Sequence, residues 1–68
     1  MLARINVTTS TIYVNGETKE FVFRGLLTQK EVREAMKEKG YSGFKILEVN
    51  RQKDYNVEID DNIIEFDN

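Results

Sequence analysis

The sequence predicts a small α+β domain, with an antiparallel sheet of four or five strands and one helix packed on one face of it. Several short segments alternate apolar and polar residues, as half-buried strands do. One Asn-Gly pair separates two of these segments, and one helical segment carries start and stop signals. The predicted element order is ββαβββ, or ββαββ if the last strands form one bent element. With 68 residues, the chain is predicted to form a single domain over 1–68.

The first predicted strand contains a change in the phase of its apolar residues. Ile5 and Val7 occupy odd positions, whereas Ile12 and Val14 occupy even positions. A shift by one residue moves side chains to the other face of a sheet unless a bulge absorbs it. We therefore expect a bulge or a sharp bend near Thr8–Thr11.

A tight hairpin is predicted at Asn15-Gly16. Asn and Gly tolerate the positive φ angles that both central positions of a type I′ turn require. The returning strand is expected over Thr18–Arg24.

A helix is predicted over Gln29–Lys39. Thr28 and Glu31 have the spacing of a capping box, in which each side chain binds the free backbone N–H of the other residue. Gly40 stands where a left-handed cap ends a helix. The apolar side is expected to carry Val32, Ala35 and Met36.

Three short strands are predicted after the helix. The first covers Phe44–Arg51, and a polar turn at Gln52-Lys53-Asp54 separates it from the second, where Tyr55, Val57 and Ile59 alternate with polar residues. A turn near Asp60–Asn62 leads into a last strand over Ile63–Phe66. The predicted core contains Ile5, Val7, Ile12, Val14, Phe21, Phe23, Leu27, Val32, Met36, Leu47, Val49, Tyr55, Val57, Ile59, Ile64 and Phe66.

The composition argues against an enzyme. The chain has no His and no Cys, so histidine bases, thiol nucleophiles and zinc fingers are excluded. A catalytic pocket would also compete with the core for the small interior. Alternating acidic residues after position 53 lack the Gly of a calcium loop, so a solvated strand explains them better than a metal site does. No catalytic residue, metal or cofactor is predicted.

Charge is divided unevenly along the chain. Residues 1–53 hold all 10 basic residues and carry a net charge of +4, whereas 54–68 carry −6. An acidic segment could bind a basic protein surface in place of a nucleic acid. The more common reason for such a segment is that charge keeps an edge strand from aggregating. The predicted function is a small non-enzymatic protein-binding module that uses an acidic C-terminal hairpin. The predicted acidic contacts are Asp54, Glu58, Asp60, Asp61, Glu65 and Asp67.

In general character the chain is similar to small accessory proteins of phages and mobile elements, which often block a host enzyme. The resemblance implies an inhibitor or accessory role. Nucleic-acid mimicry is a separate hypothesis that follows from the charge of the acidic segment.

The sheet face away from the helix is a second predicted contact surface. Tyr13, Val22 and Ile46 are expected there, together with Ile63. A contiguous apolar patch on this face would mark a partner or dimer interface. A homo-oligomeric structural unit, such as a homodimer, is therefore an alternative function.

A nucleic-acid-binding module is the other alternative. Its contacts would be Lys30, Arg33, Lys37, Lys45 and Arg51. Acidic residues intersperse this set and the pI is near 5.0, so nucleic acid is the less favoured partner and a protein with a basic surface is preferred. Because no signal peptide or membrane-spanning stretch is recognisable, a cytoplasmic location without membrane contact is expected.

Overall fold

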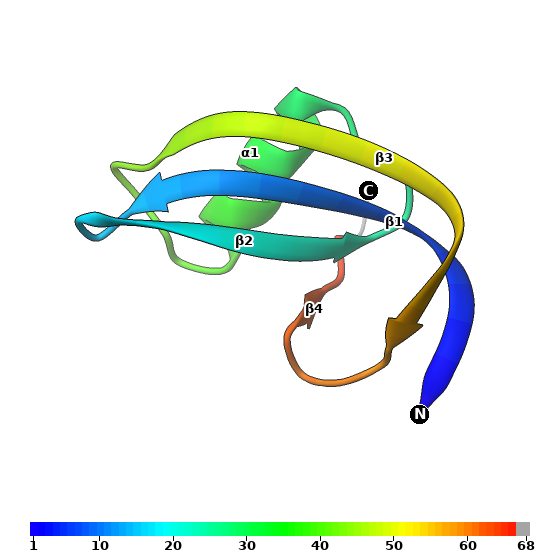
Figure 1. The fold of residues 1–68 in the computed structure, drawn as a ribbon. Helices are drawn as coiled ribbons and strands as arrows, with labels where there is room; N and C mark the ends of the chain where they lie inside the picture. Colours follow the sequence, from blue (N-terminus) through cyan, green and yellow to red (C-terminus); the bar gives the residue numbers. More distant parts are fainter. Residues whose placement is uncertain (67–68) are drawn as a thin grey trace.

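The computed structural model describes residues 1–66 and contains one helix and a mixed four-stranded sheet (Figure 1). The elements in chain order are β1 (Leu2–Val14), β2 (Glu17–Arg24), α1 (Gln29–Glu38), β3 (Lys45–Glu58) and β4 (Ile63–Ile64). The predicted α+β class is therefore confirmed.

The strands lie in the order β3-β1-β2-β4. β1 is antiparallel to both of its neighbours, but β4 runs parallel to β2, so the prediction of a wholly antiparallel sheet was wrong. After β3 the chain crosses to the far edge of the sheet and enters β4 in the direction of β2 (Figure 1). This crossing places Ile64 beside Phe23, where both side chains are buried.

The hairpin between β1 and β2 has the predicted turn. Asn15 and Gly16 both have positive φ, at 53° and 82°, as a type I′ turn requires. The pairing then continues without interruption from Val14 opposite Glu17 to Val7 opposite Arg24.

The predicted caps of α1 are also present. The N–H of Thr28 donates to Glu31 Oε1 at 2.9 Å, and the N–H of Glu31 donates to Thr28 Oγ1 at 3.2 Å. At the other end, the N–H groups of Gly40 and Tyr41 donate to the carbonyls of Lys37 and Met36, which is a Schellman motif.

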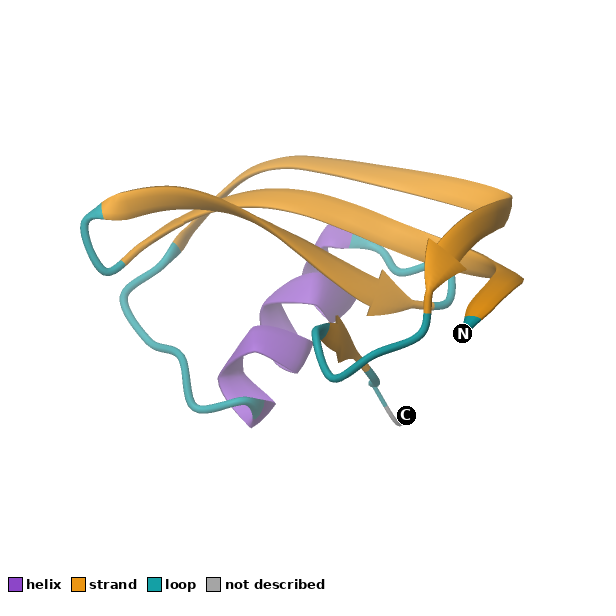
Figure 2. Ribbon diagram, turned by 60° about the horizontal axis from the view of Figure 1, so that its bottom comes forward, coloured by secondary structure: helices purple, strands orange, loops and turns teal. Residues whose placement is uncertain are grey.

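The main core lies between α1 and one face of the sheet, while the other face has no helix over it in the described chain (Figure 2). The buried members of the main core are Ile12, Val14, Phe23, Leu27, Val32, Ala35, Met36 and Ile64. We call the face without the helix the open face. Val7 is also fully buried but does not belong to this cluster.

The prediction that two further residues lie in the core was wrong. Leu47 and Tyr55 are exposed, at 51% and 41% of their surface. Ile46, which was predicted on the open face, instead packs against the core. The reason is a bulge in β3. Thr11 pairs with Glu48 but Ile12 pairs with Ile46, so Leu47 has no partner in β1. Residues of β3 before Leu47 therefore lie on the opposite face from the one that strict alternation predicts.

The phase change in β1 does not come from a bulge in β1: Val7 and Ile12 lie on opposite faces of the sheet, and both are buried. β1 runs straight through Thr8–Thr11 in its pairing with β2, and the extra residue opposite Thr11 and Ile12 belongs to β3. Three consecutive residues, Thr8, Thr9 and Ser10, are buried, so both faces of β1 are covered there.

The predicted turn at Gln52-Lys53-Asp54 was also wrong, because β3 continues to Glu58. Val7 pairs with Gln52 and Ile5 with Tyr55, so β3 holds one more residue than β1 in this interval. Asp54 takes the left-handed φ of 50°, and its N–H donates to Asn6 Oδ1 at 3.1 Å. The turn-forming residues are therefore accommodated as a second bulge.

The same pairing removes the predicted acidic hairpin. The end of β3 pairs with the start of β1, and β4 pairs with β2, so these two segments do not pair with each other.

Candidate binding edge at β3

β3 is the longest strand and forms one side of the sheet. Its 14 residues pair with β1 along one edge, and no strand among residues 1–66 pairs with the other. The opposite side of the sheet ends in β4, which has only 2 residues. The outer edge of β3 therefore offers backbone N–H and C=O groups that an additional strand could bind.

The two bulges limit how much of this edge is regular. One lies at Leu47 and the other between Gln52 and Tyr55. Bulges and charged residues are features that protect edge strands from uncontrolled pairing. Between them, Glu48–Gln52 pair regularly with β1. We call the outer backbone edge of Glu48–Gln52 the β3 edge.

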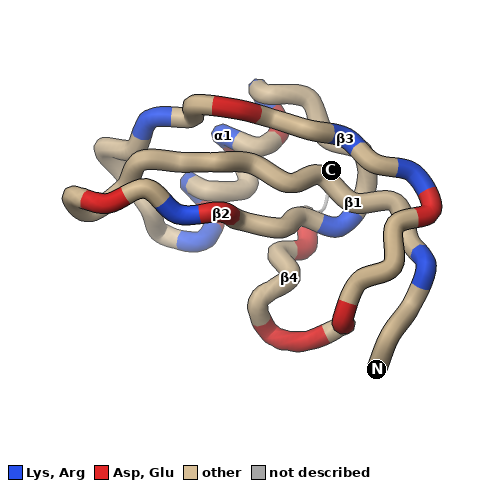
Figure 3. Tube along the Cα trace, viewed as in Figure 1, with Lys and Arg blue, Asp and Glu red and all other residues tan. Residues whose placement is uncertain are grey.

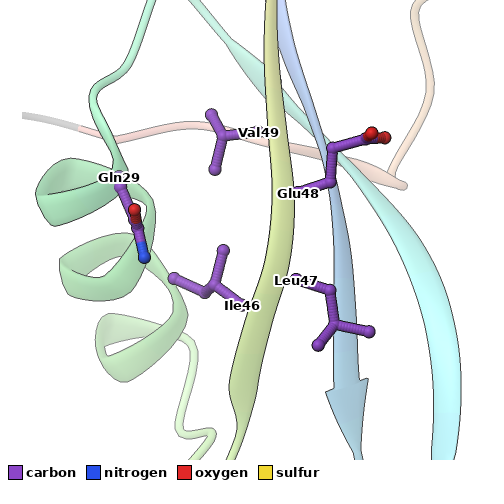
Figure 4. A pocket seen from close by; sticks show the side chains of 5 residues that line it. All are labelled: Gln29, Ile46, Leu47, Glu48 and Val49. Carbon is purple, nitrogen blue, oxygen red and sulfur yellow. The ribbon is translucent and has the colours of Figure 1, made fainter.

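A shallow depression of about 190 Å³ adjoins this strand, lined by Gln29, Ile46, Leu47, Glu48 and Val49. Gln29, at the start of α1, faces Ile46 and Val49 across it, whereas Leu47 and Glu48 direct their side chains to the other side of β3 (Figure 4). Residues from both faces of the strand thus border one depression, which places it beside the strand rather than over either face.

Hydrogen bonds fix the position of this part of the sheet. Ser10 Oγ donates to the carbonyl of Glu48 at 2.7 Å, which ties the centre of β1 to β3. Thr8 Oγ1 accepts a hydrogen bond from the N–H of Leu27 at 2.7 Å and so holds the chain that enters α1. The wall of the depression formed by α1 is therefore held against the wall formed by β3.

The basic residues predicted for nucleic acid lie on α1 and β3, but they do not share one face of the sheet. Arg33 follows Gln29 by four residues and shares its side of α1, with Lys30 and Lys37 three and four residues away from Arg33. Arg51 pairs opposite Thr8, on the face of the sheet that carries the helix. Lys45 pairs opposite Tyr13, on the open face. All five cations are exposed.

The predicted acidic contacts are not gathered into one free surface. Glu58 binds the N-terminal ammonium of Met1 at 2.6 Å, and Glu65 lies 3.6 Å from Arg24. Asp60 accepts the N–H of Asn62 at 2.8 Å within the loop before β4, and Asp61 is exposed beside it. Figure 3 shows acidic residues along the loop between β3 and β4. Asp54 lies in the second bulge, and Asp67 lies outside the described residues.

The open face carries a small exposed apolar pair. Tyr13 is 42% exposed and pairs opposite Lys45, and Leu47 protrudes from the adjacent bulge on the same face. Val22, also predicted there, pairs with Thr9 and Ile63 but is only partly exposed. Tyr13 and Leu47 therefore lie on the open face of the sheet, and Leu47 also borders the depression.

The candidate site offers few groups that could hold a metal ion. Among residues 1–66, no group of three or more acidic, His or Cys side chains is arranged to hold a metal ion. The depression is bordered by a single ionisable side chain, that of Glu48.

Sequence reasoning missed the β3 edge because the order of strands in a sheet is decided by long-range pairing. The signal that could have helped was Leu47, an apolar residue whose exposure follows from the bulge. Within the described chain, no helix has both the length and the apolar character to cross a membrane. Comparison with protein-family models, with curated proteins and with solved structures gave no match for this chain.

Proposed function

We propose that the chain is a non-enzymatic protein-binding module, and that it binds an extended segment of its partner along the β3 edge. One observation supports this above all others. A regular stretch of edge strand, Glu48–Gln52, lies next to a depression bordered by Gln29 and Val49. The backbone would supply affinity by forming a further strand, and the depression would select a side chain.

The two exposed apolar residues fit the same mode of binding. Side chains of an added strand alternate between the two faces of the sheet. Those on the helix side would reach the depression, and those on the open side would approach Leu47 and Tyr13. One added strand could therefore use the features on both sides of β3.

The acidic segment gives weaker support as the main contact surface. Glu58 and Glu65 already have internal partners, so only part of the predicted set is available to a partner protein. We therefore assign the primary contact to β3 rather than to the acidic residues. The cytosol is the proposed location, since the chain has no Cys and needs no disulfide.

The experiment is a selection of peptides from a random phage-displayed library, followed by affinity measurement on the best synthetic peptide. Gln29→Trp should fill the depression and weaken binding by about tenfold or more, the effect of losing one buried anchor. Glu38→Trp adds the same side chain at another exposed position of α1 and should leave binding unchanged. Failure to select any peptide, or equal binding by the Gln29→Trp variant, would contradict the proposal.

A further inference from the structure

We infer that the segment bound at the β3 edge is acidic, with an apolar residue for the depression and an Asp or Glu two residues away from it. The inference rests on the proposed function and names the chemistry of the partner. The evidence for an acidic segment is the set of charged side chains on the helix side of β3.

The helix side of β3 carries Arg51 and no acidic residue within Glu48–Gln52. Glu48 also borders the depression, but its side chain is directed to the open face (Figure 4). Val49 pairs with Ser10 and Arg51 with Thr8, so both lie on this face, whereas Glu48 pairs with Thr11 on the open face. In α1, Gln29 borders the depression, and Arg33 lies four residues further along, on the same side of the helix. Positive side chains thus flank the depression from the strand and from the helix.

These cations have no strong internal partner. The ion pairs within the described residues join Met1 to Glu58, Lys19 to Glu17 and Arg24 to Glu65, and none includes Arg33 or Arg51. Both side chains are exposed and available to a ligand. A carboxylate can bind the planar guanidinium of Arg in a bidentate manner.

The spacing along β3 gives the order of residues in the partner. Residues two apart in a strand point to the same face and lie about 7 Å from each other. Val49 borders the depression and Arg51 is two residues further along. A partner side chain opposite Val49 should therefore be apolar, and the one opposite Arg51 should be acidic.

A single-stranded nucleic acid fits this site less well. Its binding usually relies on aromatic side chains that stack on bases. The residues that line the depression are Gln29, Ile46, Leu47, Glu48 and Val49, with no aromatic ring among them. Unpaired backbone groups also match an extended peptide rather than a sugar–phosphate chain.

The test compares charge variants on the peptide selected above. Arg33→Gln combined with Arg51→Gln should weaken binding by about three- to tenfold at low salt, the range for two exposed ion pairs. The loss should shrink at high salt, where exposed charges are screened. The matched control is Lys19→Gln combined with Lys39→Gln, which removes two exposed positive charges away from the β3 edge and should leave binding nearly unchanged.

Two results would overturn the inference. One is a set of selected peptides with no excess of Asp and Glu, and the other is undiminished binding by the double arginine variant. A single-stranded thymidine oligonucleotide that competes with the peptide in an Arg33- and Arg51-dependent manner would likewise count against a peptide-specific site. These failures are distinct from failure of the proposed function, which is read from the Gln29→Trp variant regardless of peptide charge.

Discussion

The hydroxyl group of Thr8 connects the sheet to the start of the helix by accepting a hydrogen bond from the backbone N–H of Leu27 at 2.7 Å. The same hydroxyl donates to the carbonyl of Gly25 at 2.7 Å. Thr8 is fully buried, and its hydrogen bond with the N–H of Leu27 is buried, so that N–H has no water as a substitute partner. A polar residue in the middle of β1 thus holds the loop that leads into α1.

Thr8→Val should lower the free energy of unfolding by about 1–3 kcal/mol, because it leaves the buried N–H of Leu27 and the carbonyl of Gly25 without a partner. Urea denaturation measures the change. Thr8→Ser keeps the hydroxyl and should retain most of the stability. Equal stability of the Val variant and the parent would show that this hydroxyl does not hold the loop.

Gly40→Ala should destabilise the protein by about 1 kcal/mol, the cost of a left-handed conformation for a residue with a Cβ. Gly40 has φ 94°, and an added Cβ would meet no atom within 4 Å, so the cost is conformational and not steric. Thermal unfolding measures the change, with Gly40→Asn expected to cost less. A neutral Gly40→Ala substitution would argue against the Schellman cap.

Asp54 provides a test of the second bulge. Because its φ is 50°, Asp54→Gly should preserve or raise stability, whereas Asp54→Val should lower it by about 1–2 kcal/mol. Lys53→Val is the control at the neighbouring exposed position, and should have little effect. A stable Asp54→Val variant would contradict the left-handed conformation.

Ile46 and Leu47 provide a test of which face each occupies. Ile46→Ala should cost about 1–3 kcal/mol because Ile46 packs against the core, whereas Leu47→Ala should cost under about 0.5 kcal/mol because Leu47 is 51% exposed. Chemical denaturation of both variants compares them directly. The reverse order of stability would place Leu47, and not Ile46, in the core.

Local signals in the sequence were sufficient for the elements that depend on neighbouring residues. The capping box of Thr28 and Glu31 and the turn at Asn15-Gly16 both form hydrogen bonds or backbone conformations within four residues. These features are specified by residue type alone, so they could be predicted without knowledge of the remaining fold.

The errors arose where pairing between distant strands overrides the local pattern. Gln52-Lys53-Asp54 has turn chemistry, yet β1 offers the partners Asn6 and Ile5, and the chain stays extended. Ile46 and Leu47 exchange faces because one residue of β3 has no partner in β1. Neither bulge can be located from alternation within β3 alone.

The sequence predicted some residues of the candidate site but not the site itself. Arg33 and Arg51 were predicted together as contacts of an alternative nucleic-acid-binding module, without the depression or the strand edge between them. The fold brings them to one side of the sheet, beside a depression that no local pattern indicates. For this reason the geometry favours an acidic partner segment, where the sequence favoured a basic one.

The most direct test of strand addition at β3 is amide hydrogen exchange, measured by NMR with and without the selected peptide. In the free protein, the outward amides of Glu48–Gln52 have no strand to bind them. When the peptide binds, alternate amides within Glu48–Gln52 should become protected, since only every second residue of a strand points its backbone groups outward. Protection confined to the Asp60–Asn62 loop or to the open face, with these amides unchanged, would contradict the account.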